Sequence, residues 1–181
     1  MRIYFIGAHS TGKTTLARTV SQHWNLPFLN EIARTILAEK ELSVDNLRAN
    51  IETVNAYQED VYLRQFEEEK KHESFVSDRS FDNLAYMAQH STILAKFINE
   101  RKLIEYIDTL RKSDAVLFFV RPSRATMKAD GVRETLVWDN IVAIDAMIKL
   151  LLEMFALTYV CINTDSMQER IRTVNAVLKL V

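Results

Sequence analysis

Residues 7–14, GAHSTGKT, combine residue types whose spacing suits the binding of a polyphosphate. The chain has only three glycines, and two of them, Gly7 and Gly12, lie here directly before Lys13 and Thr14. In the pattern G-x-x-x-x-G-K-[ST], the loop turns its backbone N–H groups inward and forms a nest for an anion. The lysine reaches the β- and γ-phosphates, and the hydroxyl of Thr14 is placed to hold Mg²⁺. The motif therefore predicts a nucleotide site.

The sequence on either side of this loop supports the interpretation. Residues 1–6 are apolar and typical of a buried strand, and residues 13–24 repeat apolar side chains at helical spacing. A chance match on an ordinary turn is the alternative, but it would not supply a strand, a loop and a helix in the required order. The predicted nucleotide-binding residues of the loop are Gly7, Ala8, His9, Ser10, Thr11, Gly12, Lys13, Thr14 and Thr15.

A second candidate group follows the apolar stretch 74–78. Asp78 comes directly after this predicted strand and is suited to hold Mg²⁺ opposite Thr14. Its neighbour Arg79 is a forked donor that suits phosphate. The alternative is that Asp78 or Ser80 merely caps the helix that follows.

A third group is the basic segment at about 121–134. It contains Arg121, Arg124, Lys128 and Arg133, together with an Asp-Gly turn signal at Gly131. Phosphoryl transfer needs positive charge around the γ-phosphate as water leaves, which a mobile lid would supply. The competing interpretation is a solvated surface helix.

The composition limits the classes of protein that fit. The length of 181 residues and the hydrophobic content of 48% predict one globular domain over 1–181. The net charge of −1 argues against a general basic surface for nucleic acid or membrane. Cys161 is the only cysteine, so an internal disulfide is excluded. The apolar start is too short for a signal peptide and no apolar run is long enough to cross a bilayer, so we expect a cytoplasmic protein.

The elements that must position these residues alternate between strands and helices. Further strands are predicted at 27–31, 114–120 and 158–163, and helices at 13–24, 32–40, 45–71, 80–89, 93–112, 134–156 and 165–179. This alternation indicates an α/β fold, a parallel sheet covered on both faces. Ligands of such sheets bind beyond the C-terminal strand ends, where Asn30, Glu31, Arg34, Arg121 and Asn163 also fall.

With these residues in place, the chain resembles the P-loop nucleoside and nucleotide kinases, most closely the ribosylnicotinamide-kinase-like ATPase domains. The resemblance rests on GAHSTGKTTLA, on NEIAR after the second strand, on SDRSFDNLAY after the third and on ADGVRE in the basic segment. It implies a P-loop NTPase three-layer sandwich, with a five-stranded parallel sheet in the order 2-3-1-4-5 and a helical lid. It also implies ATP and Mg²⁺ as cofactors and a small nucleoside or nucleotide as acceptor.

The resemblance further suggests roles for individual residues. Glu31 matches the carboxylate that takes the proton of the acceptor, and Arg79 matches the arginine that approaches the acceptor. Gln58 matches a glutamine that reads the base, although an ordinary surface position fits it equally well. The rival assignment makes Asp78 the base and Glu31 a substrate clamp. The spacing between Asp-Arg and Ala-Tyr is one residue shorter than in thymidylate kinases, which argues against that substrate.

Three functions therefore compete. The first is a kinase of a small acceptor, and the second is a regulatory ATPase that has no acceptor. The third is a kinase that acts on a group carried by a nucleic acid, which the near-neutral charge disfavours. Guanine specificity is disfavoured because the late strand ends in CINTDS and lacks the lysine of N-K-x-D. The sequence leaves the acceptor and the oligomeric state open.

Overall fold

The computed structural model describes residues 1–30, 32–40, 46–47, 49–112, 114–126 and 137–180. Glu31, Arg133, Lys128 and Gly131, with the larger part of the predicted lid, lie outside the described residues. For Arg34 and Thr126 the backbone alone is described.

The described chain forms a five-stranded parallel sheet in the order β2-β3-β1-β4-β5. The strands are β1 (Arg2–Ile6), β2 (Phe28–Leu29), β3 (Phe75–Ser77), β4 (Ala115–Val120) and β5 (Val160–Ile162). β1 lies in the centre, with Arg2 opposite Phe75 on one side and opposite Ala115 on the other. The predicted fold class and strand order are therefore confirmed. The C-terminal ends of β1, β3 and β4 are brought together at one edge.

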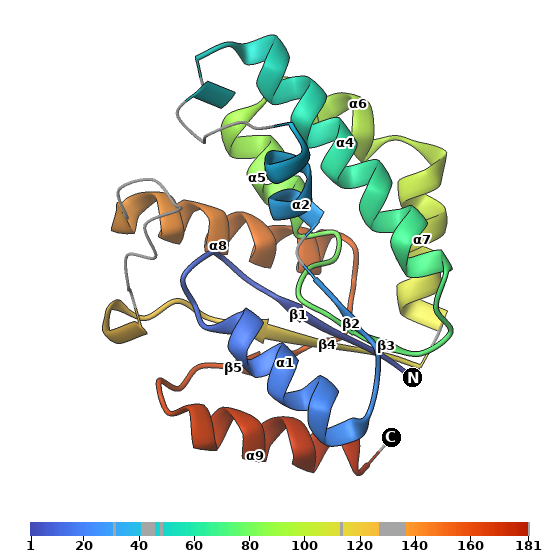
Figure 1. Ribbon diagram of the computed structural model, residues 1–181, viewed down its shortest axis with the longest axis vertical. Coiled ribbons are helices and arrows are strands. Elements are labelled where there is room, and N and C mark those ends of the chain that lie inside the picture. Colours follow the sequence, from blue (N-terminus) through green and yellow to red (C-terminus); the bar gives the residue numbers. More distant parts are fainter. Residues whose placement is uncertain (31, 41–45, 48, 113, 127–136, 181) are drawn as a thin grey trace.

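Helices cover both faces of the sheet, which gives three layers (Figure 1). α1 (Lys13–Trp24) and α9 (Met167–Leu178) lie on one face. The other described helices lie on the opposite face: α2 (Ile32–Glu39), α4 (Ile51–Lys70), α5 (Asn83–His90), α6 (Leu94–Ile98), α7 (Arg101–Lys112) and α8 (Trp138–Met154). A short 3₁₀ turn, η1 (Arg124–Thr126), follows β4. None of the helices in the described ranges has the length and apolar character needed to cross a membrane.

Each face of the sheet has its own apolar core, because side chains alternate along a strand. On β1, Ile3 and Phe5 pack towards α1 and α9, whereas Tyr4 and Ile6 pack towards the larger helical layer. All four side chains are fully buried. The central strand therefore holds both layers together and ends directly in the phosphate loop.

One predicted helix was wrong in its extent. The stretch 93–112 reads as a continuous helix, but it forms α6 and α7 with a break at residues 99–100. Phe97 and Leu103 are both buried in the same core cluster. Six residues along a straight helix turn the side chain by about 240°, so one helix would not direct both at the core. The break resolves this conflict.

Among the other helices that begin later than expected, α4 and α5 each have a local reason. α4 was expected from 45 but begins at Ile51, because the side chain of Asn50 accepts hydrogen bonds from the N–H groups of Glu52 and Thr53. α5 was expected from 80 but begins at Asn83, since the preceding residues serve the site described below.

A buried carboxylate links this core to the end of β3. Glu69 on α4 accepts hydrogen bonds from the hydroxyls of Tyr4 and Tyr106, at 2.8–2.9 Å, and from Nε2 of Gln65 at 2.7 Å. Tyr106 lies 2.8 Å from the hydroxyl of Ser80, directly after β3. Burial raises the pKa of Glu69 to about 7, which these hydrogen bonds only partly oppose.

This raised pKa predicts a stability that falls as the pH rises. The folded protein retains the Glu69 proton up to about pH 7, whereas the reference carboxyl loses it at 4.5. Stability should therefore decline between these two values, by about 3 kcal/mol if Glu69 acts alone. Glu69→Gln, which has no proton to lose, should flatten this part of the profile. Urea unfolding at a series of pH values measures it.

Glu67→Gln is the matched control, since Glu67 lies on the same helix but is exposed and paired with Lys70. It should leave the decline in place. A profile for Glu69→Gln that falls as steeply as that of the unsubstituted protein would contradict the assignment.

Candidate active site

The phosphate loop depends on backbone conformations that favour glycine. Gly7 has φ +145° and Gly12 has φ +82°, and Ser10 also lies in the left-handed region at φ +58°. A Cβ atom added to Gly7 would lie 2.4 Å from the carbonyl oxygen of Val120 at the end of β4. The loop thus passes so close to the neighbouring strand that a side chain at position 7 is excluded. Gly12 ends the loop as the N-cap of α1.

Lys13 lies inside this loop. Its Nζ donates a hydrogen bond to the carbonyl oxygen of Ala8 at 2.7 Å, and the hydroxyl of Thr11 donates to the same oxygen at 3.1 Å. Lys13 is only 4% exposed. The ammonium group is therefore held over the turn of the loop, at the start of α1, whose dipole also favours an anion.

The two residues predicted to hold Mg²⁺ lie in contact. The hydroxyl of Thr14, in the first turn of α1, donates a hydrogen bond to Oδ2 of Asp78, directly after β3. A carboxylate and a hydroxyl are oxygen ligands of the kind that Mg²⁺ takes, with phosphate oxygens and water completing its shell. The pair therefore fits the ion. A cap role for Asp78 is wrong, because α5 begins at Asn83.

The segment after Asp78 fastens the first glycine of the loop. Arg79 and Asp82 form a buried ion pair at 3.1 Å. Arg79 donates to the carbonyl oxygen of Gly7 at 3.2 Å, and Oδ2 of Asp82 accepts the N–H of Gly7 at 3.3 Å. The Arg79 guanidinium also lies 4.5 Å from the ring centroid of Tyr86. Sequence reasoning did not single out Asp82, although it is the second aspartate of SDRSFD.

Ser80 does not cap α5 with its side chain. Its hydroxyl pairs with Tyr106, and its N–H donates to Oδ1 of Asp82 at 2.7 Å. The capping alternative for Ser80 is therefore wrong.

The arginines after β4 are held by α8. Arg121 donates to Asp145 at 3.0 Å through Nε and lies 2.7 Å from its second oxygen through Nη2. Arg124 is exposed, and its guanidinium lies 4.8 Å from the ring centroid of Trp138. For neither side chain do the described contacts include the phosphate loop. Whether residues 121–134 form a lid or a surface helix is not tested, because 127–136 lie outside the described residues. The lid therefore stays a prediction.

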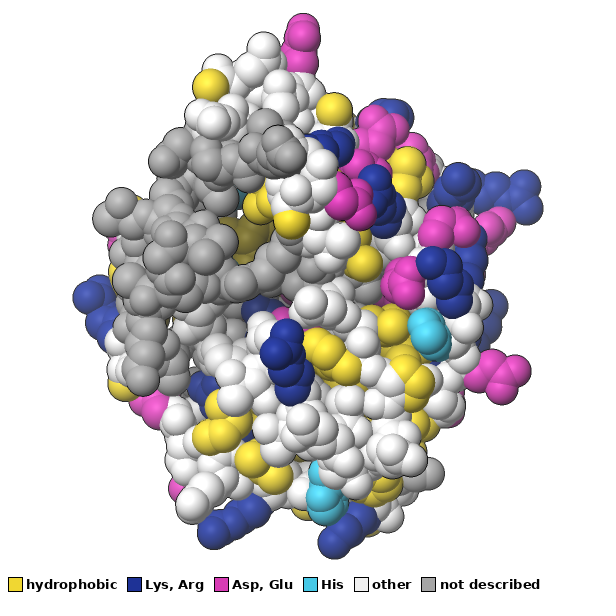
Figure 2. All heavy atoms as spheres, in the orientation of Figure 1, with side chains coloured by type: hydrophobic (Ala, Val, Ile, Leu, Met, Phe, Trp, Pro, Cys, Tyr) yellow, Lys and Arg dark blue, Asp and Glu magenta, His cyan; other side chains and the backbone are white. Residues whose placement is uncertain are grey.

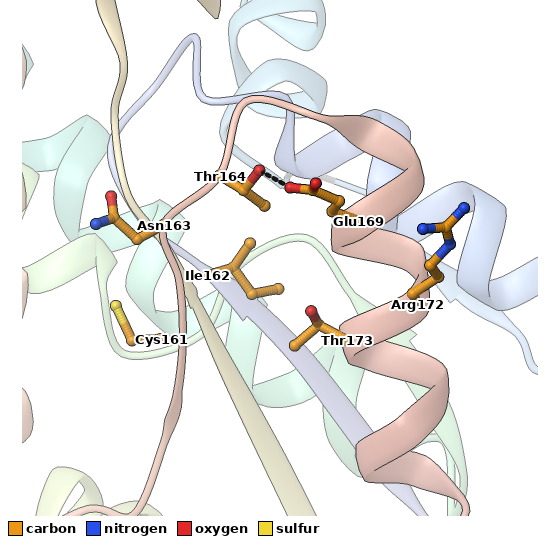
Figure 3. A pocket seen from close by; sticks show the side chains of 7 residues that line it. All are labelled: Cys161, Ile162, Asn163, Thr164, Glu169, Arg172 and Thr173. Atoms are coloured by element: carbon orange, nitrogen blue, oxygen red, sulfur yellow. Dashed lines mark hydrogen bonds between the residues drawn. The ribbon is translucent and has the colours of Figure 1, made fainter.

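Asn163 lies at a separate hollow beside the edge strand β5. A pocket of about 400 Å³ opens between β5 and α9. Figure 3 shows Ile162 and Thr164 on the side of the strand that faces α9, whereas the side chains of Asn163 and Cys161 point away from the helix. Thr164 donates to Glu169 across its mouth at 2.5 Å. Whether Asn163 contacts a nucleotide stays a prediction.

Gln58 is buried on α4, with 7% of its surface exposed. The surface interpretation of this residue is therefore wrong. The role of base reading stays a prediction.

Comparisons with known proteins agree with this arrangement. The model of a family described as AAA domain matches residues 2–170. A search of curated proteins returns no significant match. Among solved structures, the chain is similar to a deoxyadenosine kinase from M. mycoides with products dCMP and dCDP, at 14% identity and a TM-score of 0.71 over 100% of both chains.

Two further structures are similar over almost the whole chain. The NadR protein in complex with NR has 17% identity and a TM-score of 0.75, over 98% of this chain and 50% of that one. A shikimate kinase from Acinetobacter baumannii in complex with shikimate has 13% identity and a TM-score of 0.62, over 98% and 93%. At such identities the likeness establishes the fold.

The close approach of Gly7 to β4 predicts a marked difference between the two loop glycines. Gly7→Ala should destabilise the protein by about 3 kcal/mol or more, because the added carbon meets a fixed carbonyl oxygen at an unfavourable φ. Gly12→Ala is also strained, at φ +82°, but should cost less, since its added carbon meets Nη1 of Arg170 at 3.1 Å and not a backbone oxygen at 2.4 Å. Urea unfolding compares the two variants. Equal costs would contradict the described packing of the loop.

Proposed function

We propose that this chain, which belongs to the AAA domain family, is an ATP-dependent kinase that transfers the γ-phosphoryl group to a nucleoside, nucleotide or related small acceptor. The observation that carries the proposal is the contact between Thr14 and Asp78 beside the buried Lys13. These groups supply an oxygen pair for a metal and a cation for the phosphates at one loop. The likeness in fold to a deoxyadenosine kinase and a shikimate kinase adds support.

In this proposal the phosphates of ATP lie against backbone N–H groups of the loop that follows Gly7 and against the start of α1. Lys13 turns from the carbonyl of Ala8 to the β- and γ-phosphates and neutralises charge there. Thr14 and Asp78 hold Mg²⁺, which supplies positive charge to the same oxygens when bound. This electrostatic stabilisation is largest in the transition state, when negative charge spreads over the transferred group.

The acceptor is proposed to lie on the side of β3 and β2. Glu31 accepts the proton of its hydroxyl, since β2 lies one strand further from the loop than β3. Arg79 supplies positive charge beside Gly7, and Gln58 offers its amide to the acceptor. Arg124 and Arg133 act on the rate by closing over the phosphates.

A small acceptor is favoured over a nucleic acid by the pattern of charge. Figure 2 shows acidic and basic side chains intermingled at the upper right of the face that it displays. On and beside α4 they form exposed ion pairs, such as Arg64 with Glu39 and Lys96 with Glu59. Paired charges of both signs give little attraction to a phosphate backbone.

The test is phosphoryl transfer from radiolabelled ATP to a panel of nucleosides, nucleotides and polynucleotides. We expect turnover that depends on one small acceptor. Lys13→Met keeps the aliphatic part of the buried side chain and should lower kcat by roughly 10²-fold or more. Lys112→Met, on the exposed end of α7, is the control and should leave kcat unchanged. Hydrolysis of ATP at the same rate with and without every acceptor would instead indicate a regulatory ATPase. Transfer of the label to a polynucleotide would indicate a nucleic-acid kinase.

The division of work between the two carboxylates gives a separate prediction. Asp78→Asn should raise the Mg²⁺ concentration needed for half-maximal rate, because it removes a charged ligand. Glu31→Gln should keep the Mg²⁺ dependence and ATP binding but lose transfer, because it removes the base. Mg²⁺ titrations and acceptor KM values for both variants measure this. If Glu31→Gln is fully active while Asp78→Asn is inactive at saturating Mg²⁺, then Asp78 is the base and Glu31 is not.

A further inference from the structure

A second positive charge lies behind the phosphate loop, on a helix far away in the sequence. Arg170 on α9 is 1% exposed and is one of the largest fully buried side chains among the described residues. Its Nη1 donates to the carbonyl oxygen of Thr11 at 2.5 Å, and its Nε donates to the carbonyl oxygen of Thr164 at 2.6 Å. The same Nη1 lies 3.1 Å from where a Cβ of Gly12 would be. The guanidinium therefore packs directly against the second glycine of the loop.

This buried charge has carbonyl oxygens as its hydrogen-bond partners. Across the described ranges, Arg170 has no carboxylate within ion-pair distance, and Asp165 acts on it only from further away. Burial accordingly lowers the pKa of the guanidinium, although arginine remains charged at any ordinary pH. A buried cation is costly unless an opposite charge compensates it. An anion bound in the loop would supply that compensation.

The contact with the carbonyl oxygen of Thr11 is connected to the N–H of Gly12 through one peptide group. The carbonyl of Thr11 and the N–H of Gly12 belong to the same planar unit. No hydrogen bond of this N–H is seen to any part of the chain that is described. A charge-assisted bond to the oxygen polarises the unit and makes the N–H a stronger donor.

We propose that Arg170 is a positioning residue of the nucleotide site, which orients and polarises the Thr11–Gly12 peptide so that the Gly12 N–H binds a polyphosphate. That this polyphosphate belongs to ATP rests on the function proposed above. The role of Arg170 in binding the anion does not require transfer to any acceptor.

Because the chain has few glycines, the amide of Gly12 can be observed by itself in an NMR spectrum. Gly12 is the only glycine that follows a threonine, so labelling with ¹³C′-threonine and ¹⁵N-glycine selects its amide alone. In the free protein, Arg170→Gln and Arg170→Met should shift this amide resonance upfield, and Arg170→Lys should restore part of the shift. Arg172→Gln removes the same charge from an exposed position on α9 and should leave the resonance in place.

Binding of inorganic tripolyphosphate, followed by calorimetry at a temperature where every variant is folded, gives the second readout. Arg170→Gln should weaken it by about tenfold or more, as for the loss of a hydrogen bond to a charged group. Arg170→Lys should lose less, and Arg172→Gln should bind as the unsubstituted protein does. In the unsubstituted protein, the guanidinium resonances of Arg170 should shift when tripolyphosphate binds, which requires no variant.

The proposal is overturned if Arg170→Gln lowers the melting temperature but keeps the Gly12 resonance and the tripolyphosphate affinity, because Arg170 would then only anchor α9. It is also overturned if the guanidinium resonances of Arg170 do not shift when tripolyphosphate binds. Tripolyphosphate binding without phosphoryl transfer would contradict the proposed kinase and leave the role of Arg170 intact.

Discussion

The phosphate loop must offer several N–H groups to an anion, and it is held in shape by hydrogen bonds to its carbonyl oxygens. Arg79 binds the oxygen of Gly7, Lys13 binds that of Ala8, and Arg170 binds that of Thr11. Asp82 holds the N–H of Gly7 and is itself paired with Arg79. Because three cations surround one short turn, the loop is prepared for an anion before any ligand arrives. The strands and helices serve to bring these side chains, which are far apart in the sequence, to one place.

The same logic explains why so many polar groups are buried in a protein of this size. Glu69, Asp82 and Arg170 are each almost fully buried, and each belongs to a chain of hydrogen bonds that ends at the site. Glu69 reaches Ser80 through Tyr106, and Asp82 reaches both Ser80 and the loop. Buried polar networks of this kind cost stability but fix a single arrangement. The segment from Asp78 to Asp82 is therefore positioned from two directions, by the core beneath it and by the loop beside it.

Much of this arrangement could be predicted from the sequence, because strands that alternate with helices and the spacing of GAHSTGKT each reflect local rules. The contact between Thr14 and Asp78 followed from the expected neighbours of β1. The break between α6 and α7 could not be predicted, since it depends on the tertiary burial of Phe97 and Leu103. Asp82 and Arg170 were missed because their role is defined by contacts across the fold. Arg170 did leave a signal, as it shares the buried stripe of α9 with Val174 and Leu178 at helical spacing.

We propose that this loop, with Lys13, Thr14 and Asp78, is a site for ATP and Mg²⁺. A crystal structure with Mg²⁺ and a non-hydrolysable ATP analogue would show where the phosphates and the metal bind. We expect Nζ of Lys13 to leave the carbonyl of Ala8 for the β- and γ-phosphates, and the metal to lie beside Thr14 and Asp78. A structure in which the phosphates bind elsewhere, with Lys13 still on Ala8 and Thr14 still donating to Asp78, would contradict it.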